Sequence, residues 1–203
     1  MFTGGNLDNI KWQKYLRIGE EDFSASCEVD EGARNLHKNL IDMLPPRDKI
    51  LDIGCGTGWS TNEFTKKYNY AVGISIQTSE IDFAMKNYYS NDKLCFELMD
   101  MHELKFSDSH FDTVYMREVL EHSIAPFIAL CEANRVLKIS GMLLVNVPDQ
   151  TWQDWHCHYI VPTDLQLRSL LAKTNFIVEK FGTTEAGHNW YLTVKTGDID
   201  WIK

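Results

Sequence analysis

The 203-residue sequence, with 44% hydrophobic and 24% charged residues, has the length and composition of one globular domain, which excludes a fibrous or disordered class. A formal net charge of -9 with only short basic clusters disfavours a nucleic-acid partner, which needs gathered Lys and Arg. Apolar runs stay below the roughly 18 residues of a membrane span, the first residues have no secretory leader, and the cysteines form no Cys-x-x-Cys pair, so we expect a cytoplasmic protein without a membrane partner.

From about residue 49, short apolar runs alternate with amphipathic stretches, the pattern of strand and helix units around a parallel sheet. We expect strands at 49–53, 70–74, 94–98, 111–116 and 142–147, with helices at 58–68, 79–89 and 124–138. The last helix would bury one face formed by Ile124, Phe127, Ile128, Cys131, Val136 and Leu137.

Beyond Gly141 the pattern changes, and Pro162 opens a helix that runs through Ala172. Two further strands, at 176–181 and 191–194, are joined by a glycine-containing loop and predict an antiparallel pair at the sheet edge. The expected fold is therefore α/β, with a doubly wound, mostly parallel seven-stranded sheet, an antiparallel C-terminal hairpin and helices on both faces.

The most informative segment is the apolar strand that ends at Asp52 and opens through Gly54, Gly56 and Gly58 into a helix. Glycines at such a turn allow a ligand to approach the backbone closely. A dinucleotide fingerprint would need a third glycine where Trp59 stands. A carboxylate at Asp52 would repel a pyrophosphate and attract an ammonium group, so the pattern predicts a ligand with an amino-acid end.

With this loop the sequence resembles the class I, seven-stranded, Rossmann-like S-adenosylmethionine-dependent methyltransferases of type 11, whose first motif is Asp-x-Gly-x-Gly-x-Gly. Three later segments, 96–101, 111–122 and 135–148, resemble further motifs of that family in the same order. The resemblance spans about residues 45 to 181. It implies one methyltransferase domain over 1–203, with a cap or lid at 1–30 and the core at 45–196, and S-adenosylmethionine as the cofactor.

The resemblance also implies a set of cofactor-binding residues. In the family, a carboxylate at the place of Asp100 accepts a hydrogen bond from the adenine amino group, and the next residue lines the ring. The set is Asp52, Gly54, Cys55, Gly56, Gly58, Ser75, Ile76, Gln77, Asp100, Met101 and Arg117.

The sequence departs from the family at the end of the second strand. Most members have an acid there that pairs with the ribose hydroxyls, whereas this chain has Ser75 and Gln77. Both can hydrogen-bond a diol as neutral groups. The departure leaves open a catalytically inactive, cofactor-binding relative.

Histidines in two segments that should border the acceptor pocket are candidates for a general base. They are His122, after the fourth strand, and His156 and His158, after the fifth. The run Glu118, Glu121, His122 also resembles a metal-binding motif of two methyltransferase groups, provided that the segment turns helically. In many relatives without a metal the same glutamates cap a helix or point to solvent, and we favour this second interpretation.

The sequence thus predicts an enzyme that transfers a methyl group from S-adenosylmethionine to a small-molecule acceptor, with a hydroxyl as the expected acceptor group. The alternatives are a methyltransferase that acts on a macromolecule, namely an RNA end, a protein or a glycan, and the inactive relative. The acceptor pocket consists of loops that follow no general code, so the sequence does not name the substrate.

Overall fold

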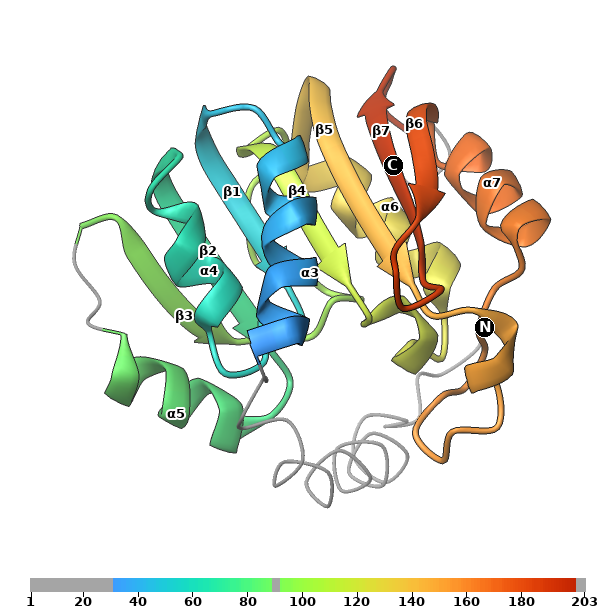
Figure 1. The fold of residues 1–203 in the computed structure, drawn as a ribbon. Helices are drawn as coiled ribbons and strands as arrows, with labels where there is room; N and C mark the ends of the chain where they lie inside the picture. The colour runs from blue at the N-terminus through green and yellow to red at the C-terminus, as the bar shows by residue number, and fades with distance from the viewer. Residues whose placement is uncertain (1–30, 89–91, 200–203) are drawn as a thin grey trace, which may run out of the picture.

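The computed structural model describes residues 31–88 and 92–199, and it contains one seven-stranded sheet in the order β3-β2-β1-β4-β5-β7-β6 (Figure 1). The strands are β1 (Arg47–Ile53), β2 (Tyr68–Ser75), β3 (Leu94–Leu98), β4 (Phe111–Arg117), β5 (Leu137–Val147), β6 (Phe176–Thr183) and β7 (Asn189–Lys195). Strands β1 to β5 pair in parallel, and β7 pairs antiparallel with both β5 and β6. This confirms the predicted mostly parallel sheet with its antiparallel hairpin. The cap expected at 1–30 lies outside the described residues.

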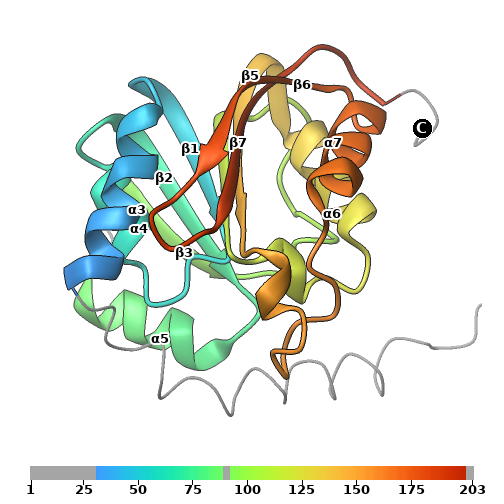
Figure 2. The same ribbon diagram turned by 45° about the vertical axis from the view of Figure 1, so that its right-hand side comes forward.

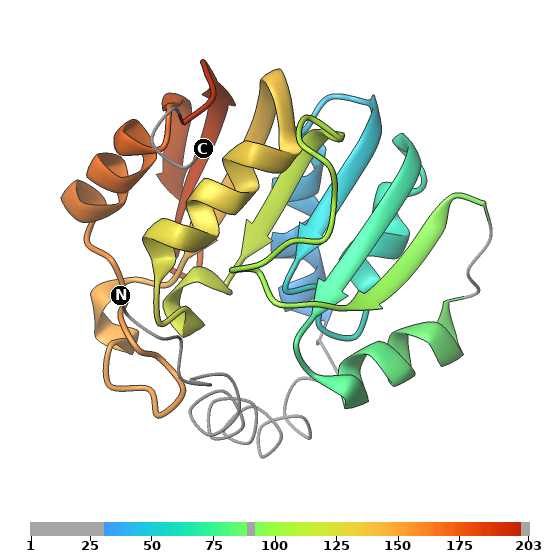
Figure 3. The same cartoon turned by 180° about the vertical axis from the view of Figure 1, so that it is seen from behind.

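Helices cover both faces of the sheet (Figures 2 and 3). They are α3 (Glu31–Met43), α4 (Trp59–Phe64), α5 (Thr78–Asn87), α6 (Pro126–Val136) and α7 (Asp164–Lys173), with short 3-10 turns η1 (Leu120–His122) and η2 (Gln150–Trp152). Because successive strand residues point to opposite faces, Ile50 packs in the core under α3, α4 and α5, and Leu51 packs in the core under α6 and α7. No helix in the described part of the chain is long and apolar enough to cross a membrane.

Three helices differ from the sequence expectations. Helix α4 ends at Phe64 because Tyr68 already pairs with Arg47 as the first residue of β2. The apolar face expected for α6 is wrong in part, since Ile124 and Ile128 are 52% and 43% exposed. Its buried side instead presents small side chains and Leu130 to the sheet. Helix α3 was not predicted from the sequence.

Strand β5 is longer than expected and begins at Leu137 rather than at 142, directly after the last residue of α6. No loop separates the two elements, and the register of β5 against β4 shifts between Phe111 and Thr113.

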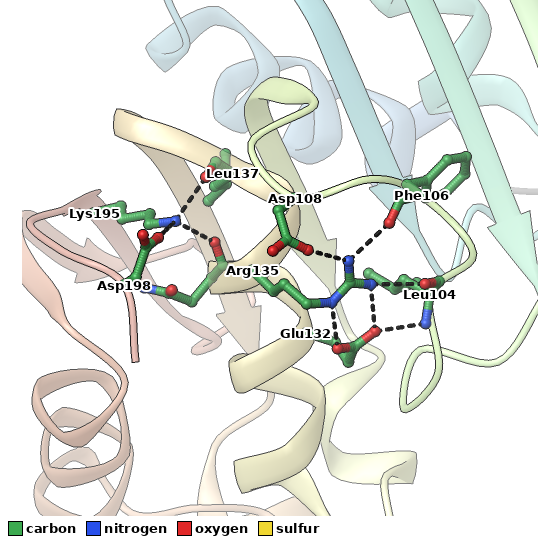
Figure 4. A network of polar contacts seen from close by, with 9 residues as sticks. Leu104, Phe106, Asp108, Glu132, Arg135, Leu137, Lys195 and Asp198 are labelled. Atoms are coloured by element: carbon green, nitrogen blue, oxygen red, sulfur yellow. Dashed lines mark hydrogen bonds and ion pairs between the residues drawn. The ribbon is translucent and has the colours of Figure 1, made fainter. Parts of the chain in front are cut away.

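A polar network holds the end of α6 in place (Figure 4). The Arg135 guanidinium donates to both carboxylate oxygens of Glu132, to Asp108 and to the carbonyls of Leu104 and Phe106. It thereby fixes the loop between β3 and β4. The ammonium of Lys195, which is buried on β7, donates to the carbonyl oxygens of Asn134 and Leu137, both at 2.8 Å.

Candidate active site

The glycine loop between β1 and α4 is anchored to the end of β2. The amides of Gly54 and Cys55 both donate to the carbonyl of Ile74 at 2.9 Å. Gly54 has a φ of +74°, and a Cβ there would lie 2.5 Å from a methyl group of Val119. A larger residue would therefore move the loop away from the segment that follows β4.

Asp52 ends up almost fully buried, 1% exposed, beneath this loop. The Ser60 and Thr61 hydroxyls, in the first turn of α4, donate to its Oδ2 at 2.6 and 2.7 Å. Burial raises the pKa of Asp52 to about 6, although these hydrogen bonds and the charge of Arg117 act in the opposite direction. The carboxylate is thus held rigidly, ionised at neutral pH, and deprived of water, so a cationic ligand group would be attracted to it.

Beside the end of β2, the first turn of α5 presents a carboxylate that the sequence interpretation did not include. The Ser75 hydroxyl donates to Glu80 Oε2 at 2.5 Å and accepts from the Gln77 amide at 3.1 Å. Burial raises the pKa of Glu80, and the Ser75 hydrogen bond counteracts this.

These groups border one cavity with a volume of about 340 Å³ at the carboxyl ends of β1, β2 and β4. Most of the predicted cofactor residues line it, namely Asp52, Gly54, Cys55, Gly56, Ser75, Ile76, Gln77, Met101 and Arg117. Gly58 and Asp100 are not among its described lining residues. Gly58 makes room for the Phe96 ring, and the Asp100 carboxylate accepts hydrogen bonds from the amide and Nδ1 of His102.

Three cavity-lining side chains carry buried polar atoms that have no hydrogen-bond partner among residues 31–88 and 92–199. They are Nδ1 of His37, Oε1 of Gln77 and the hydroxyl of Tyr115. His37 stacks on the Trp59 indole at 5.5 Å, and burial lowers its pKa to about 3, so its ring is neutral. Unpaired buried polar atoms are costly, which indicates that this cavity is shaped for a polar ligand. Together with the buried Asp52, they fit a nucleoside that carries an amino-acid end, as S-adenosylmethionine does. His37 has no motif that would have identified it in the sequence, whereas Tyr115 lies in the segment 111–122 that resembles a family motif but was not among the predicted site residues.

The three candidate histidines are in different positions relative to the cavity. His122 lines it, with Nδ1 at 3.0 Å from the carbonyl oxygen of Cys157. His156 and His158 are not among the described lining residues, and the His158 ring packs edge-on against His122 at 4.9 Å. Cys157 and Tyr159, from the same segment, do border the cavity.

Glu121 Oε1 lies 4.0 Å from His122 Nε2, but the geometry does not bring Glu118 to the same point, as the metal interpretation requires. Glu118 has a φ of +47° and contacts His188 and Arg117, whereas Glu121 is turned into the core, 1% exposed. A continuous helical turn, which would align the three, is therefore interrupted at its first residue. Among the described residues, the group whose potential metal-binding atoms lie within 4.8 Å of one another is His122, Cys157 and His158.

The contact between Glu118 and His188 was also not predicted. It joins the loop after β4 to the turn between β6 and β7, 70 residues apart in the sequence. Burial raises the pKa of Glu118, but the hydrogen bond from His188 and the Arg117 charge outweigh this and lower it. Glu118 lines the cavity as an ionised group, and Arg117 is its neighbour there.

Known proteins of similar sequence include methyltransferases. Residues 51–145 match a family model described as a methyltransferase domain. A 27-O-demethylrifamycin SV methyltransferase of Amycolatopsis mediterranei is 34% identical over 143 residues, which cover 68% of this chain and 52% of that protein. An O-methyltransferase of Pyrenophora dematioidea is 29% identical over 81% of this chain and 68% of its own length. The chain spans about half the length of the rifamycin relative, or less for several others.

Solved structures share the fold at lower identity. The N-methyltransferase NodS from Bradyrhizobium japonicum, in complex with S-adenosylhomocysteine, aligns with a TM-score of 0.75 at 14% identity over 90% of this chain and 99% of that one. The cyclase SpnF aligns with a TM-score of 0.73 at 16% identity over 92% and 94%. The sheet order and the glycine loop define an α/β protein with a nucleoside-type site. With the matching family model, the chain contains a methyltransferase domain over residues 51–145, of the class I, S-adenosylmethionine-dependent type.

Proposed function

We propose that the protein transfers a methyl group from S-adenosylmethionine to a hydroxyl group of a small molecule. The observation that carries this proposal is the continuity of one cavity from Asp52 and the glycine loop to a second wall formed by His122, Cys157 and Tyr159. The first wall suits the cofactor, and the second would border the acceptor. When bound, the cofactor would supply an electrophilic methyl group, because the bond from this group to the sulfonium sulfur breaks to leave a neutral thioether.

The residues of the chain hold the reactants and accept a proton. Asp52 receives the ammonium of the amino-acid end, and the glycine loop lets the ligand lie against the backbone. His122 can donate Nδ1–H to the Cys157 carbonyl, and in that tautomer its Nε2 is the basic nitrogen. His122 would take the proton that the acceptor hydroxyl loses as its oxygen bonds to the methyl carbon.

Two considerations support oxygen as the acceptor atom. A neutral amine attacks with its own lone pair, whereas a hydroxyl benefits from a base, and a histidine lines this cavity. The relatives from Amycolatopsis mediterranei, Penicillium expansum and Pyrenophora dematioidea are named as methyltransferases of oxygen. Other relatives, from Arabidopsis thaliana, are named phosphoethanolamine N-methyltransferases, so nitrogen is the competing assignment.

The test is methyl transfer from isotope-labelled S-adenosylmethionine to a panel of small phenols, alcohols and amines. The labelled atom in each product is assigned by mass spectrometry and NMR. We expect O-methyl products, and we expect His122→Ala to lower turnover by about 100-fold or more, the usual contribution of a positioned base. The matched control is His110→Gln, since His110 stands just before the start of β4, at the far end of that strand from the cavity. Exclusive N-methylation, or full turnover by His122→Ala, would contradict the proposal.

A further inference from the structure

The structure assigns recognition of the ribose diol to Glu80, on α5, because the end of β2 has no carboxylate for this role. This inference rests on the use of S-adenosylmethionine proposed above. It concerns one residue that the family resemblance does not include, because in this chain the usual acidic position is occupied by Ser75.

The order of the strands fixes where the ribose must lie. Asp52 is on β1, and Met99 and Met101 follow β3, while β2 lies between β1 and β3 in the sheet. A nucleoside whose amino-acid end is at Asp52 and whose adenine is at Met101, as the family resemblance implies, has its ribose at the end of β2. The cavity wall there consists of Ser75, Ile76, Gln77 and Glu80.

Glu80 is the only carboxylate on this part of the described cavity wall. The other two described lining carboxylates are Asp52, at the end of β1, and Glu118, which His188 and Arg117 engage after β4. Two adjacent hydroxyls are donors, and an ionised carboxylate is the strongest acceptor that a protein offers them.

Ser75 is a positioning residue for Glu80 and not itself the donor to the diol. Its hydroxyl hydrogen is given to Glu80 Oε2 at 2.5 Å, and its oxygen accepts from the Gln77 amide at 3.1 Å. With Oε2 fixed in this way, Oε1 points toward the glycine loop and lies 4.0 Å from where a Cβ of Gly56 would be. Both Glu80 and Gly56 border the cavity, so the carboxylate faces the space between the loop and the end of β2.

The first turn of α5 therefore takes the place of the strand-end acid. Glu80 is in the first turn of α5, where the exposed amide groups of the helix favour a negative charge. Its carboxylate thus remains an acceptor even though it is largely shielded from water.

Calorimetric titration with two ligands tests this assignment. One is S-adenosylhomocysteine, and the other is the same compound without its two ribose hydroxyls, S-(2′,3′-dideoxyadenosyl)homocysteine. We expect Glu80→Ala to weaken binding of the first by about 10- to 100-fold, as for the loss of hydrogen bonds to a charged acceptor, and to leave binding of the second unchanged. Glu80→Gln should lose less, since its amide oxygen still accepts. Ser75→Ala should also lose affinity for the first ligand only.

Asp82→Asn is the matched control, because Asp82 is exposed on the same helix and does not border the cavity. Thermal unfolding of each variant shows whether it is folded. Equal losses for both ligands in Glu80→Ala, or no loss for either, would overturn the assignment. Equal affinity of the parent for the two ligands would overturn it as well, with cofactor use intact. A parent protein that binds neither S-adenosylmethionine nor S-adenosylhomocysteine would overturn the proposed function and this assignment together.

Discussion

Replacing Asp52 with asparagine should make the ligand-free protein more stable and the cofactor complex weaker. Burial raises the pKa of this carboxyl from 3.8 to about 6 in the folded chain. A difference of that size corresponds to about 3 kcal/mol, which the ionised side chain costs the folded state at neutral pH. The folded protein binds the proton more tightly than the unfolded chain does, so this contribution to stability is present below about pH 4 and is lost as the pH rises through about 6.

Asparagine does not ionise, and its amide oxygen can still accept from Ser60 and Thr61. Asp52→Asn should therefore exceed the parent in free energy of unfolding at pH 7 by up to about 3 kcal/mol, and the two should converge at low pH. Its affinity for S-adenosylhomocysteine should fall about 10- to 100-fold, because the ammonium loses an ionised partner. In the parent this affinity should increase with pH up to about 6 and then level off.

Urea unfolding of the ligand-free protein and calorimetric titration with S-adenosylhomocysteine, both between about pH 5 and 8, measure the two effects. Asp48→Asn, an exposed position on the same strand, is the control and should change neither. The reasoning fails if Asp52→Asn binds the ligand as tightly as the parent, or if the variant unfolds more easily at pH 7.

Three further substitutions test the packing around the cavity by urea unfolding. Gly58→Ala should lose about 2 to 4 kcal/mol, because φ is +86° and the new Cβ would lie 2.8 Å from the Phe96 ring; unchanged stability would contradict the backbone argument. Lys195→Met should lose about 3 kcal/mol, since two carbonyls and the Asp198 carboxylate give up a buried ammonium; a loss below about 1 kcal/mol would mean that water replaces it. Tyr115→Phe should gain about 1 kcal/mol by removing an unpartnered hydroxyl, whereas Tyr68→Phe, whose hydroxyl bonds Thr113 at 3.2 Å, should lose stability; the reverse order would refute this account.

The parts of the fold that were predictable are those encoded locally. Each parallel strand is a short apolar run that ends near a turn signal. The glycines between Asp52 and Gly58 predict a tight turn, and all three have a positive φ in the structure. The antiparallel hairpin was also predictable, because a short glycine-containing loop joins its strands. Errors arose at helix ends, where pairing across the sheet decides the boundary. Tyr68 begins β2 because Arg47 is beside it, which no local pattern reveals.

The site was less predictable because several of its contacts join distant segments. Glu118 meets His188 across 70 residues, and Glu80, whose Oε2 accepts from Ser75, lines the cavity from α5. His37 belongs to a helix without a recognisable motif and becomes relevant through its place over the cavity. The interruption at Glu118, where φ is positive, likewise removes the helical alignment that the metal interpretation assumed.

The ammonium of Lys195 has a consequence for the order in which the chain can fold. Helix α6 runs straight into β5, so no glycine or loop is available to satisfy the carbonyls at its end. The Leu137 amide donates to the carbonyls of Ala133 and Asn134, and a side chain located 61 and 58 residues further along the sequence adds a donor to Asn134 and Leu137. The last turn of α6 therefore acquires its final partners only when β7 has paired with β5. We expect the end of this helix to become fully ordered when the antiparallel strands pair, and not during the earlier pairing of β1, β2 and β4.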